Sequence, residues 1–227
     1  AERQYTLEEY EAQGMFEAVE VMRSDALSTE DESLKELLAA GRLREFLRCA
    51  VHYRKNIVVS GSTNSGKTTF LNTLLREVPS EERLLTIEDV RELRASVPNA
   101  AHLLASKGGQ GVAKVTIQDL LEACLRLRPD RIILGELRGA EASSFLHAVN
   151  SGHPGSLTSV HADSPALAFE RLALMVMQGN VALSREQILA YLRGVVDIVI
   201  QVRKIGGRRR VSGVYYKYMP QTELAGE

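Results

Sequence analysis

The sequence predicts an α/β fold built on a mainly parallel central sheet. Short apolar runs alternate along the chain with longer stretches that have the periodicity of amphipathic helices. The first apolar run leads directly into a glycine-rich loop, and the last two runs flank a Gly-Gly pair, as in a β-hairpin. Because strands that alternate with helices are typical of α/β proteins with a parallel core, we expect this architecture here.

The N-terminal part of the chain is predicted to be largely helical. A helix is expected over Tyr5 to Arg23, started by a capping box at Thr6 and broken near Gly14. Residues 27–32 are polar and are expected to form a loop. Ser33 to Arg54 is predicted to be mostly helix, because its apolar residues recur on one helical face.

The remaining elements follow in regular alternation. Apolar runs predict strands over Ile57 to Val59, Leu84 to Ile87, Ile132 to Leu134, Ser156 to Val160, Ile198 to Val202 and Val211 to Tyr215. Helical periodicity predicts helices over Thr68 to Val78, Ile117 to Leu127, Ala140 to Asn150 and Ala166 to Gln178. Ser164 and Pro165 supply a cap and a first-turn proline to the last of these helices, and Ser184 opens another capping box.

The bulk composition describes a globular protein without a strong charge bias. Of the 227 residues, 44% are hydrophobic and 25% are charged, which is enough apolar material for a sizeable core. The net charge of −1 gives no electrostatic case for nucleic-acid binding. The longest uninterrupted apolar run, Leu172 to Met177, is much shorter than the roughly 20 residues of a membrane span. The acidic N-terminus lacks the pattern of a secretory signal, so a cytoplasmic protein is expected.

The most specific motif is a phosphate-binding loop directly after the first predicted strand. Residues 61–68 fit the pattern G-x4-G-K-[ST] at each fixed position, which predicts binding of ATP and Mg²⁺. Backbone N–H groups of such a loop point at phosphate oxygens, and the following helix adds a partial positive charge. Lys67 is expected to reach the β- and γ-phosphates, and Thr68 to offer its hydroxyl to Mg²⁺. The expected nucleotide-binding residues are Gly61, Ser62, Thr63, Asn64, Ser65, Gly66, Lys67, Thr68 and Thr69.

Two carboxylates and a histidine follow other strands of the predicted sheet. Hydrolysis needs an acidic group near the metal and a second group that orients the attacking water. Glu136 follows the strand Ile132 to Leu134 and is the expected metal residue, because ligands gather at the carboxyl edge of open α/β sheets. Glu88 is the candidate base that orients water, and His161 is the candidate sensor of the γ-phosphate. Each of the three, taken alone, also fits a structural role at a strand end.

Four segments, in this order, resemble the motifs of the secretion ATPase superfamily. Residues 61–69 look like its Walker A motif, and residues 85–93 look like its Asp box. Residues 125–139 are similar to its Walker B segment, and residues 152–162 to its His box. Over nearly its whole length the chain thus resembles the traffic ATPases of type IV secretion and conjugation systems (the VirB-eleven type).

This resemblance implies a RecA-like P-loop domain in a homo-hexameric ring that hydrolyses Mg-ATP to drive substrate transfer or pilus biogenesis. The implied place is the cytoplasmic side of the inner membrane, with other secretion-system ATPases and inner-membrane components as partners. Residues 33–227 are expected to form the ATPase domain, and residues 1–32 a linker after an absent N-terminal domain. Family members neutralise ATP with arginines of that domain, so the donor here stays open; Arg91, Arg94 and Arg138 are candidates.

Several alternatives to this interpretation fit parts of the sequence. A pilus retraction motor is the nearest of them, and an assembly ring that uses ATP with slow turnover cannot be separated from a motor by sequence. A GTP switch is disfavoured because no Asn-Lys-x-Asp guanine-reading tetrapeptide occurs. A small-molecule kinase is disfavoured by the resemblance of the His box. The arginines 208–210 are expected to be solvated, with acidic lipid or DNA as the alternative contact, and sequence-specific nucleic-acid binding is not expected.

Overall fold

The computed structural model describes residues 11–13, 27–106, 115–179 and 181–220. Within these ranges the strands form one sheet in the order β3-β2-β4-β5-β1-β6-β7. All neighbouring strands pair in parallel except β6 and β7, which form an antiparallel hairpin. The strands are β1 (Ile57–Ser60), β2 (Leu84–Glu88), β3 (Ala100–Leu104), β4 (Arg131–Leu134), β5 (Leu157–Val160), β6 (Ile198–Ile205) and β7 (Arg208–Tyr216).

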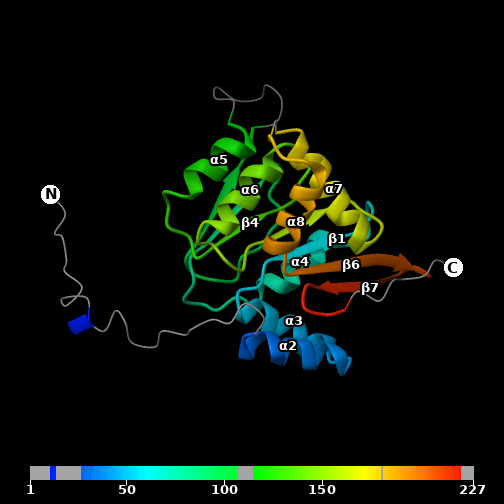
Figure 1. Cartoon of the computed structure of the whole chain (residues 1–227). Coiled ribbons are helices and arrows are strands. Elements are labelled where there is room, and N and C mark those ends of the chain that lie inside the picture. The colour runs from blue at the N-terminus through cyan, green and yellow to red at the C-terminus, as the bar shows by residue number, and fades with distance from the viewer. Residues whose placement is uncertain (1–10, 14–26, 107–114, 180, 221–227) are drawn as a thin grey trace.

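Helices cover the sheet on both faces, as Figure 1 shows. On one face lie α5 (Ile117–Cys124), α6 (Glu141–Asn150), α7 (Pro165–Met177) and α8 (Arg185–Val195). On the other lie α2 (Thr29–Ala39), α3 (Leu43–His52) and α4 (Lys67–Leu75). The predicted α/β fold, with its mainly parallel sheet and C-terminal hairpin, is confirmed.

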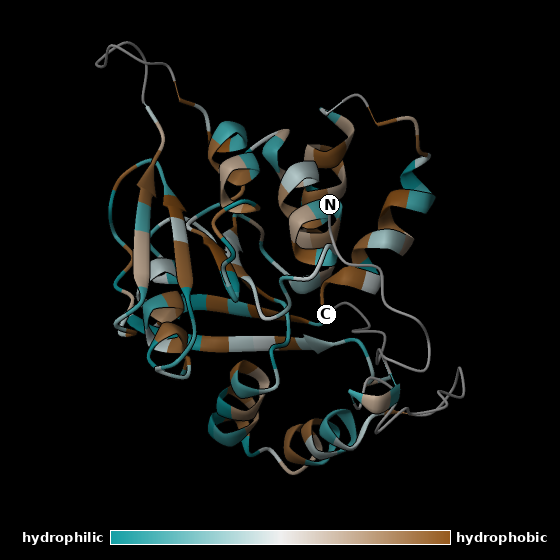
Figure 2. Cartoon of the chain, turned by 90° about the vertical axis from the view of Figure 1, so that its left-hand side faces the viewer, coloured by the Kyte–Doolittle hydropathy of each residue, from teal (hydrophilic) through white to brown (hydrophobic). Residues whose placement is uncertain are grey.

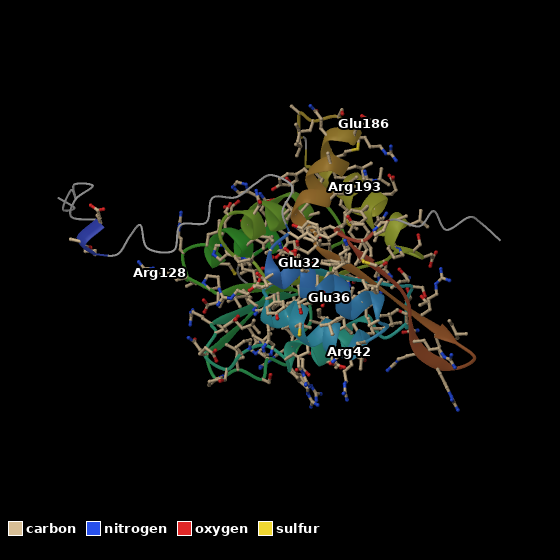
Figure 3. All side chains as sticks on the ribbon, turned by 60° about the horizontal axis from the view of Figure 1, so that its bottom comes forward. Glu32, Glu36, Arg42, Arg128, Glu186 and Arg193 are labelled. Carbon is tan, nitrogen blue, oxygen red and sulfur yellow. The ribbon has the colours of Figure 1, made fainter. Side chains whose placement is uncertain are left out.

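Alternate residues of each strand enter two separate cores, because successive side chains of a strand point to opposite faces. Ile132 and Leu134 pack under α5 to α8, whereas Ile133 between them packs toward α2 to α4. Figure 2 shows apolar residues along the strands and on parts of the surrounding helices. The charged side chains labelled in Figure 3 on α2 and α8 are exposed; they are Glu32, Glu36, Glu186 and Arg193. The helices are therefore amphipathic, and no described helix is long and apolar enough to cross a membrane.

The structure corrects the prediction for residues 27–54. The predicted loop over residues 27–32 is wrong, because α2 begins at Thr29 with Ser28 as its N-cap. Its first turn is acidic, and carboxylates there interact favourably with the helix dipole, so the polar composition marked a helix start and not a loop. The division expected after residue 32 falls inside α2. The single helix expected over Ser33 to Arg54 is two helices, separated at Gly41, whose φ is +69°.

Further differences concern the rest of the chain. Strand β3 was not predicted, since Ala100–Leu104 is a half-buried edge strand without a continuous apolar run. Helices α4 and α5 end at Leu75 and Cys124, each three residues before the predicted end. The helix expected over Tyr5 to Arg23 lies outside the described residues, apart from residues 11–13.

Candidate active site

The phosphate-binding loop joins β1 to α4 and is shaped by two glycines. Gly66 caps α4 in the left-handed conformation, with φ +98°, which favours glycine. At Gly61, a Cβ would lie 2.5 Å from both the Ser65 hydroxyl oxygen and the Val202 carbonyl oxygen, so no side chain fits there. The loop therefore closes tightly between the central strand and the N-terminus of α4, where backbone N–H groups are available to an anion.

Lys67 is buried within this loop and is 7% exposed. Its ammonium donates to the carbonyls of Gly61 at 3.0 Å and Ser62 at 3.2 Å. The same nitrogen lies 3.2 and 3.4 Å from the two ring nitrogens of His161. Burial lowers the pKa of Lys67, and the negative charge of Glu136 opposes that effect. Among the described residues no carboxylate forms an ion pair with this ammonium, so an incoming phosphate would be its direct charge partner.

Glu136 lies at the centre of a chain of polar contacts. One carboxylate oxygen is 2.5 Å from His161 Nε2, and the other is 2.6 Å from Arg138 Nη2. Arg138 also reaches the carboxylate of Asp89 at 2.6 Å. A continuous series of contacting side chains thus crosses the carboxyl edge of the sheet, from the phosphate loop to the end of β2. Its members are, in order, Lys67, His161, Glu136, Arg138 and Asp89. A change at any member alters the charge felt by its neighbours.

The backbone on both sides of Glu136 is anchored to neighbouring strands. The N–H of Gly135 donates to the Ile87 carbonyl at 2.9 Å, and the N–H of Leu137 donates to the Ser159 carbonyl at 2.9 Å. The Ser159 hydroxyl in turn donates to the Gly135 carbonyl at 2.7 Å. These bonds tie β4 to β2 on one side and to β5 on the other, so the position of Glu136 follows from the sheet itself.

Glu88 ends β2 and is 5% exposed. One of its oxygens, Oε1, accepts the backbone N–H groups of Glu92 at 2.9 Å and Leu93 at 2.8 Å. The other oxygen, Oε2, is buried and has no hydrogen-bond partner among the described residues. Since buried polar atoms are nearly always partnered, this oxygen is suited to accept a hydrogen bond from a bound molecule.

Glu88, Glu136, His161, Lys67 and Thr68 all line one cavity of about 260 Å³. The structure therefore brings together at one site the side chains that the sequence placed at separate strand ends. Burial lowers the pKa of His161; the charge of Glu136 raises it, and the charges of Lys67 and Arg138 lower it further. A neutral imidazole is thus favoured beside the Lys67 ammonium.

A larger cavity, of about 960 Å³, opens on the outer side of α4. Two of the three arginine candidates, Arg91 and Arg94, line this larger cavity, whereas Arg138 lines the smaller one. The smaller cavity is the one that holds the predicted chemical groups.

Asn72 is a contributor that sequence reasoning missed. From one turn after Thr68 on α4, its amide nitrogen donates to the Glu92 carbonyl at 3.0 Å, and its oxygen accepts the Arg94 N–H at 2.7 Å. These two bonds hold the loop whose N–H groups hold Glu88. A polar residue on an exposed helix face gives no sequence signal for such a clamp, because the clamp depends on the loop that packs against the helix.

The residues present fit a magnesium ion bound together with a nucleotide. The described residues contain no cluster of three or more His, Cys, Asp or Glu that would hold a metal alone. Mg²⁺ in phosphate sites needs few protein ligands, because phosphate and water oxygens complete its shell. The Thr68 hydroxyl and the Glu136 carboxylate line the same cavity and are oxygen donors of the kind that Mg²⁺ prefers.

Comparison with known proteins places these features in a family. A model of the family described as type II/IV secretion system protein matches residues 18–207. The type IV secretion system protein VirB11 of Bartonella henselae is 39% identical over 99% of this chain and 66% of its own length. The crystal structure of the VirB11 ATPase from the Brucella suis type IV secretion system, in complex with sulphate, superposes with a TM-score of 0.86. This Brucella protein is 44% identical to the chain, and the match covers 95% of this chain and 66% of the Brucella chain.

A more distant likeness concerns the fold alone. The pilus retraction motor PilT with bound ADP is 24% identical, with a TM-score of 0.57, over 73% of this chain and 48% of its own. The chain spans just under two thirds of the length of the two VirB11 proteins. The family match covers most of the chain and includes the phosphate loop, Glu88, Glu136 and His161. The chain therefore belongs to the type II/IV secretion system protein family.

Proposed function

We propose that this chain binds Mg-ATP at residues 61–69 and hydrolyses it to energise a type IV secretion system. The observation that carries the proposal is the single cavity shared by Lys67, Thr68, Glu88, Glu136 and His161. A phosphate loop next to a partner-free buried carboxylate oxygen combines a site for the triphosphate with a site for the attacking water.

Binding would use the loop backbone first. The N–H groups at the N-terminus of α4 would receive the phosphates, and Lys67 would exchange its loop carbonyls for phosphate oxygens. The exchange replaces two neutral acceptors with charged ones, and charge-assisted hydrogen bonds are roughly twice as strong as neutral ones. Lys67 therefore contributes more in the ATP-bound state than its present contacts indicate.

Hydrolysis would use the two carboxylates in different ways. Glu88 Oε2 would accept a hydrogen bond from the attacking water and orient it, while Oε1 stays on the two loop N–H groups. Thr68 and Glu136 would hold Mg²⁺, which when bound supplies positive charge to the β- and γ-phosphates. His161, between Lys67 and Glu136, would report loss of the γ-phosphate through both contacts.

The type IV branch is supported by the relatives. Two VirB11 proteins share 39% and 44% identity with the chain, against 24% for the pilus retraction motor. We extend to this chain, as part of the same proposal, a homo-hexameric ring on the cytoplasmic side of the inner membrane, with other secretion-system ATPases and inner-membrane components as partners. The ATPase domain of this proposal includes the whole of α2, because residues 29–32 belong to that helix.

The experiment is a comparison of Lys67→Ala with Lys35→Ala, an exposed lysine on α2 that serves as a matched control. ATP binding by isothermal titration and phosphate release are measured on both variants and on the unchanged chain. The proposal expects Lys67→Ala to lose release to background and Lys35→Ala to retain it. Undiminished phosphate release by Lys67→Ala would refute the assignment of the site.

A further inference from the structure

The C-terminal hairpin contacts both ends of the phosphate loop, at Gly61 and at Gly66. Strand β6 pairs in parallel with β1 up to Ser60 and Gln201, which brings Val202 level with Gly61. The Val202 carbonyl oxygen then occupies the space that a side chain at position 61 would need, at 2.5 Å from the Cβ position. The hairpin therefore forms one wall of the loop.

The second contact is made by Arg209 of β7, which pairs with Lys204 across the hairpin. A Cβ at Gly66 would lie 2.6 Å from Arg209 Cδ, 2.8 Å from Nε and 3.4 Å from Cζ. The side chain thus lies directly on the backbone of Gly66, the residue that precedes Lys67. The hairpin arginines were expected to be solvated, and Arg209 is indeed exposed, while its side chain also lies against the phosphate loop.

Among the described residues, no carboxylate pairs with the guanidinium of Arg209. In the part of the chain that the structure describes, it forms no ion pair and no hydrogen bond, whereas Arg138 contacts both Glu136 and Asp89. An unpaired guanidinium beside a helix N-terminus adds a second positive charge to the same place. Its five N–H donors match the geometry of phosphate oxygens.

We propose that Arg209 binds the phosphate chain of the nucleotide from the hairpin side, within the same subunit. This inference rests on the proposed function of the loop and adds to it a cationic residue supplied by β7. The family match ends at residue 207, so it does not include Arg209. Because Gly66 lies at the base of the loop, before Lys67 and Thr68, Arg209 serves the phosphates that ATP and ADP share, and the γ-phosphate falls to Lys67 and His161.

The hairpin offers its own controls. Arg208 and Arg210 flank Arg209 in β7, and successive side chains of a strand point to opposite faces. Arg208→Ala and Arg210→Ala remove the same charge from the same strand without removing the contact on Gly66. Arg209→Gln keeps most of the side chain's packing on Gly66 and removes the charged guanidinium with its fork of N–H donors.

The test is isothermal titration of ATP and of ADP into the full chain and these variants, with thermal melting as a check of folding. A hydrogen-bonded charge predicts that Arg209→Ala and Arg209→Gln weaken both nucleotides by about 10- to 100-fold. The two flanking variants should change affinity by less than about threefold, as expected for charges screened by salt.

Two outcomes would overturn the inference. Affinities of Arg209→Ala and Arg209→Gln that match those of Arg208→Ala would remove the phosphate role of Arg209. A loss confined to ATP would contradict its placement on the shared phosphates. The proposed function would fail on a separate result, namely phosphate release by Lys67→Ala equal to that of the unchanged chain.

Discussion

Strands β2 and β4 lie side by side and carry charged residues at both of their ends, but the two ends differ. At the amino ends, Glu82 and Arg131 are buried and pair with each other through two hydrogen bonds, one of 2.9 Å. At the carboxyl ends, Glu88 and Glu136 each keep a buried carboxylate oxygen without a hydrogen-bond partner among the described residues, and Glu136 also contacts the exposed side chains of Arg138 and His161.

The difference separates structure from chemistry on the same pair of strands. A buried ion pair whose groups satisfy each other fixes the strands and has nothing left to offer a ligand. A buried carboxylate oxygen without a partner costs stability, so it is kept where a bound molecule completes it. We therefore interpret the amino edge as a clamp and the carboxyl edge as the reactive edge, and each of the following variants tests one side of that contrast.

The largest effect is expected from Glu88→Gln. The amide oxygen can still accept the N–H groups of Glu92 and Leu93, so the loop stays in place while the charge that orients water is lost. Turnover should fall by about 10²- to 10⁴-fold, with nucleotide affinity retained. Phosphate release beside isothermal titration measures both quantities. Glu122→Gln on the exposed side of α5 is the control, and normal turnover by Glu88→Gln would assign the base elsewhere.

The next effect concerns the Glu82–Arg131 ion pair at the amino edge. Arg131→Met leaves the buried Glu82 only its 3.3 Å ion pair with Arg54, and removal of one member of a buried ion pair costs about 3–5 kcal/mol. Urea denaturation should show this loss, while the nucleotide affinity of the folded fraction stays unchanged. The double variant Arg131→Met/Glu82→Leu should recover much of the stability. A lower nucleotide affinity in the folded single variant would mean that the two edges are not independent.

A smaller effect is expected when the Asn72 clamp is removed. Asn72→Ala loses both bonds to the loop that holds Glu88, so the carboxylate should be less well oriented. We expect turnover to fall by about tenfold, within the loss typical of a misplaced catalytic group, with little change in ATP affinity. Thr73→Ala, at the next position of α4, is the control. Combined with Glu88→Gln, Asn72→Ala should add nothing, and an additive loss would show that Asn72 acts by another route.

The smallest effect is the pH dependence of the stability that the Glu82–Arg131 ion pair contributes. Burial raises the pKa of Glu82, but the hydrogen bonds and charge of Arg131 outweigh burial and hold that pKa below the usual 4.5. A carboxyl group whose pKa is lower in the folded state stabilises the fold above its unfolded pKa and loses that contribution as pH falls. The stability difference between the unchanged chain and Glu82→Gln should therefore be full at pH 7 and shrink below about pH 4.5. A constant difference across this range would contradict the assigned ion pair.

Much of the reactive edge could be predicted from sequence, and particular residues show why the rest could not. The loop over residues 61–69 has a fixed spacing, and Glu88, Glu136 and His161 each follow a strand whose carboxyl end must reach the same edge. Local pattern is enough for such positions. Asn72 contacts Glu92, which is 20 residues away in sequence, and Arg209 contacts Gly66, which is more than 140 residues away. No periodicity in the sequence encodes such contacts.

Two errors in the predicted secondary structure have a similar cause. The polar stretch at residues 27–32 has a composition common to loops and to acidic first turns of helices, and only the packing of α2 on α3 decides between them. Strand β3 is an edge strand without an apolar run, and its pairing with β2 is what makes it a strand. Both elements depend on partners that lie elsewhere in the chain.

The most direct test of the contrast within the reactive edge is the binding of Mn²⁺, in place of Mg²⁺, to the complex with ATP, followed by electron paramagnetic resonance. The measurement does not depend on turnover, so it separates the proposed metal residue Glu136 from the proposed base Glu88. We predict that Glu136→Gln weakens Mn²⁺ binding by about tenfold or more, as loss of one charged ligand would, while Glu88→Gln binds Mn²⁺ as the unchanged chain does. Equal weakening in both variants, or weakening in Glu88→Gln alone, would contradict the division of roles between the two carboxylates.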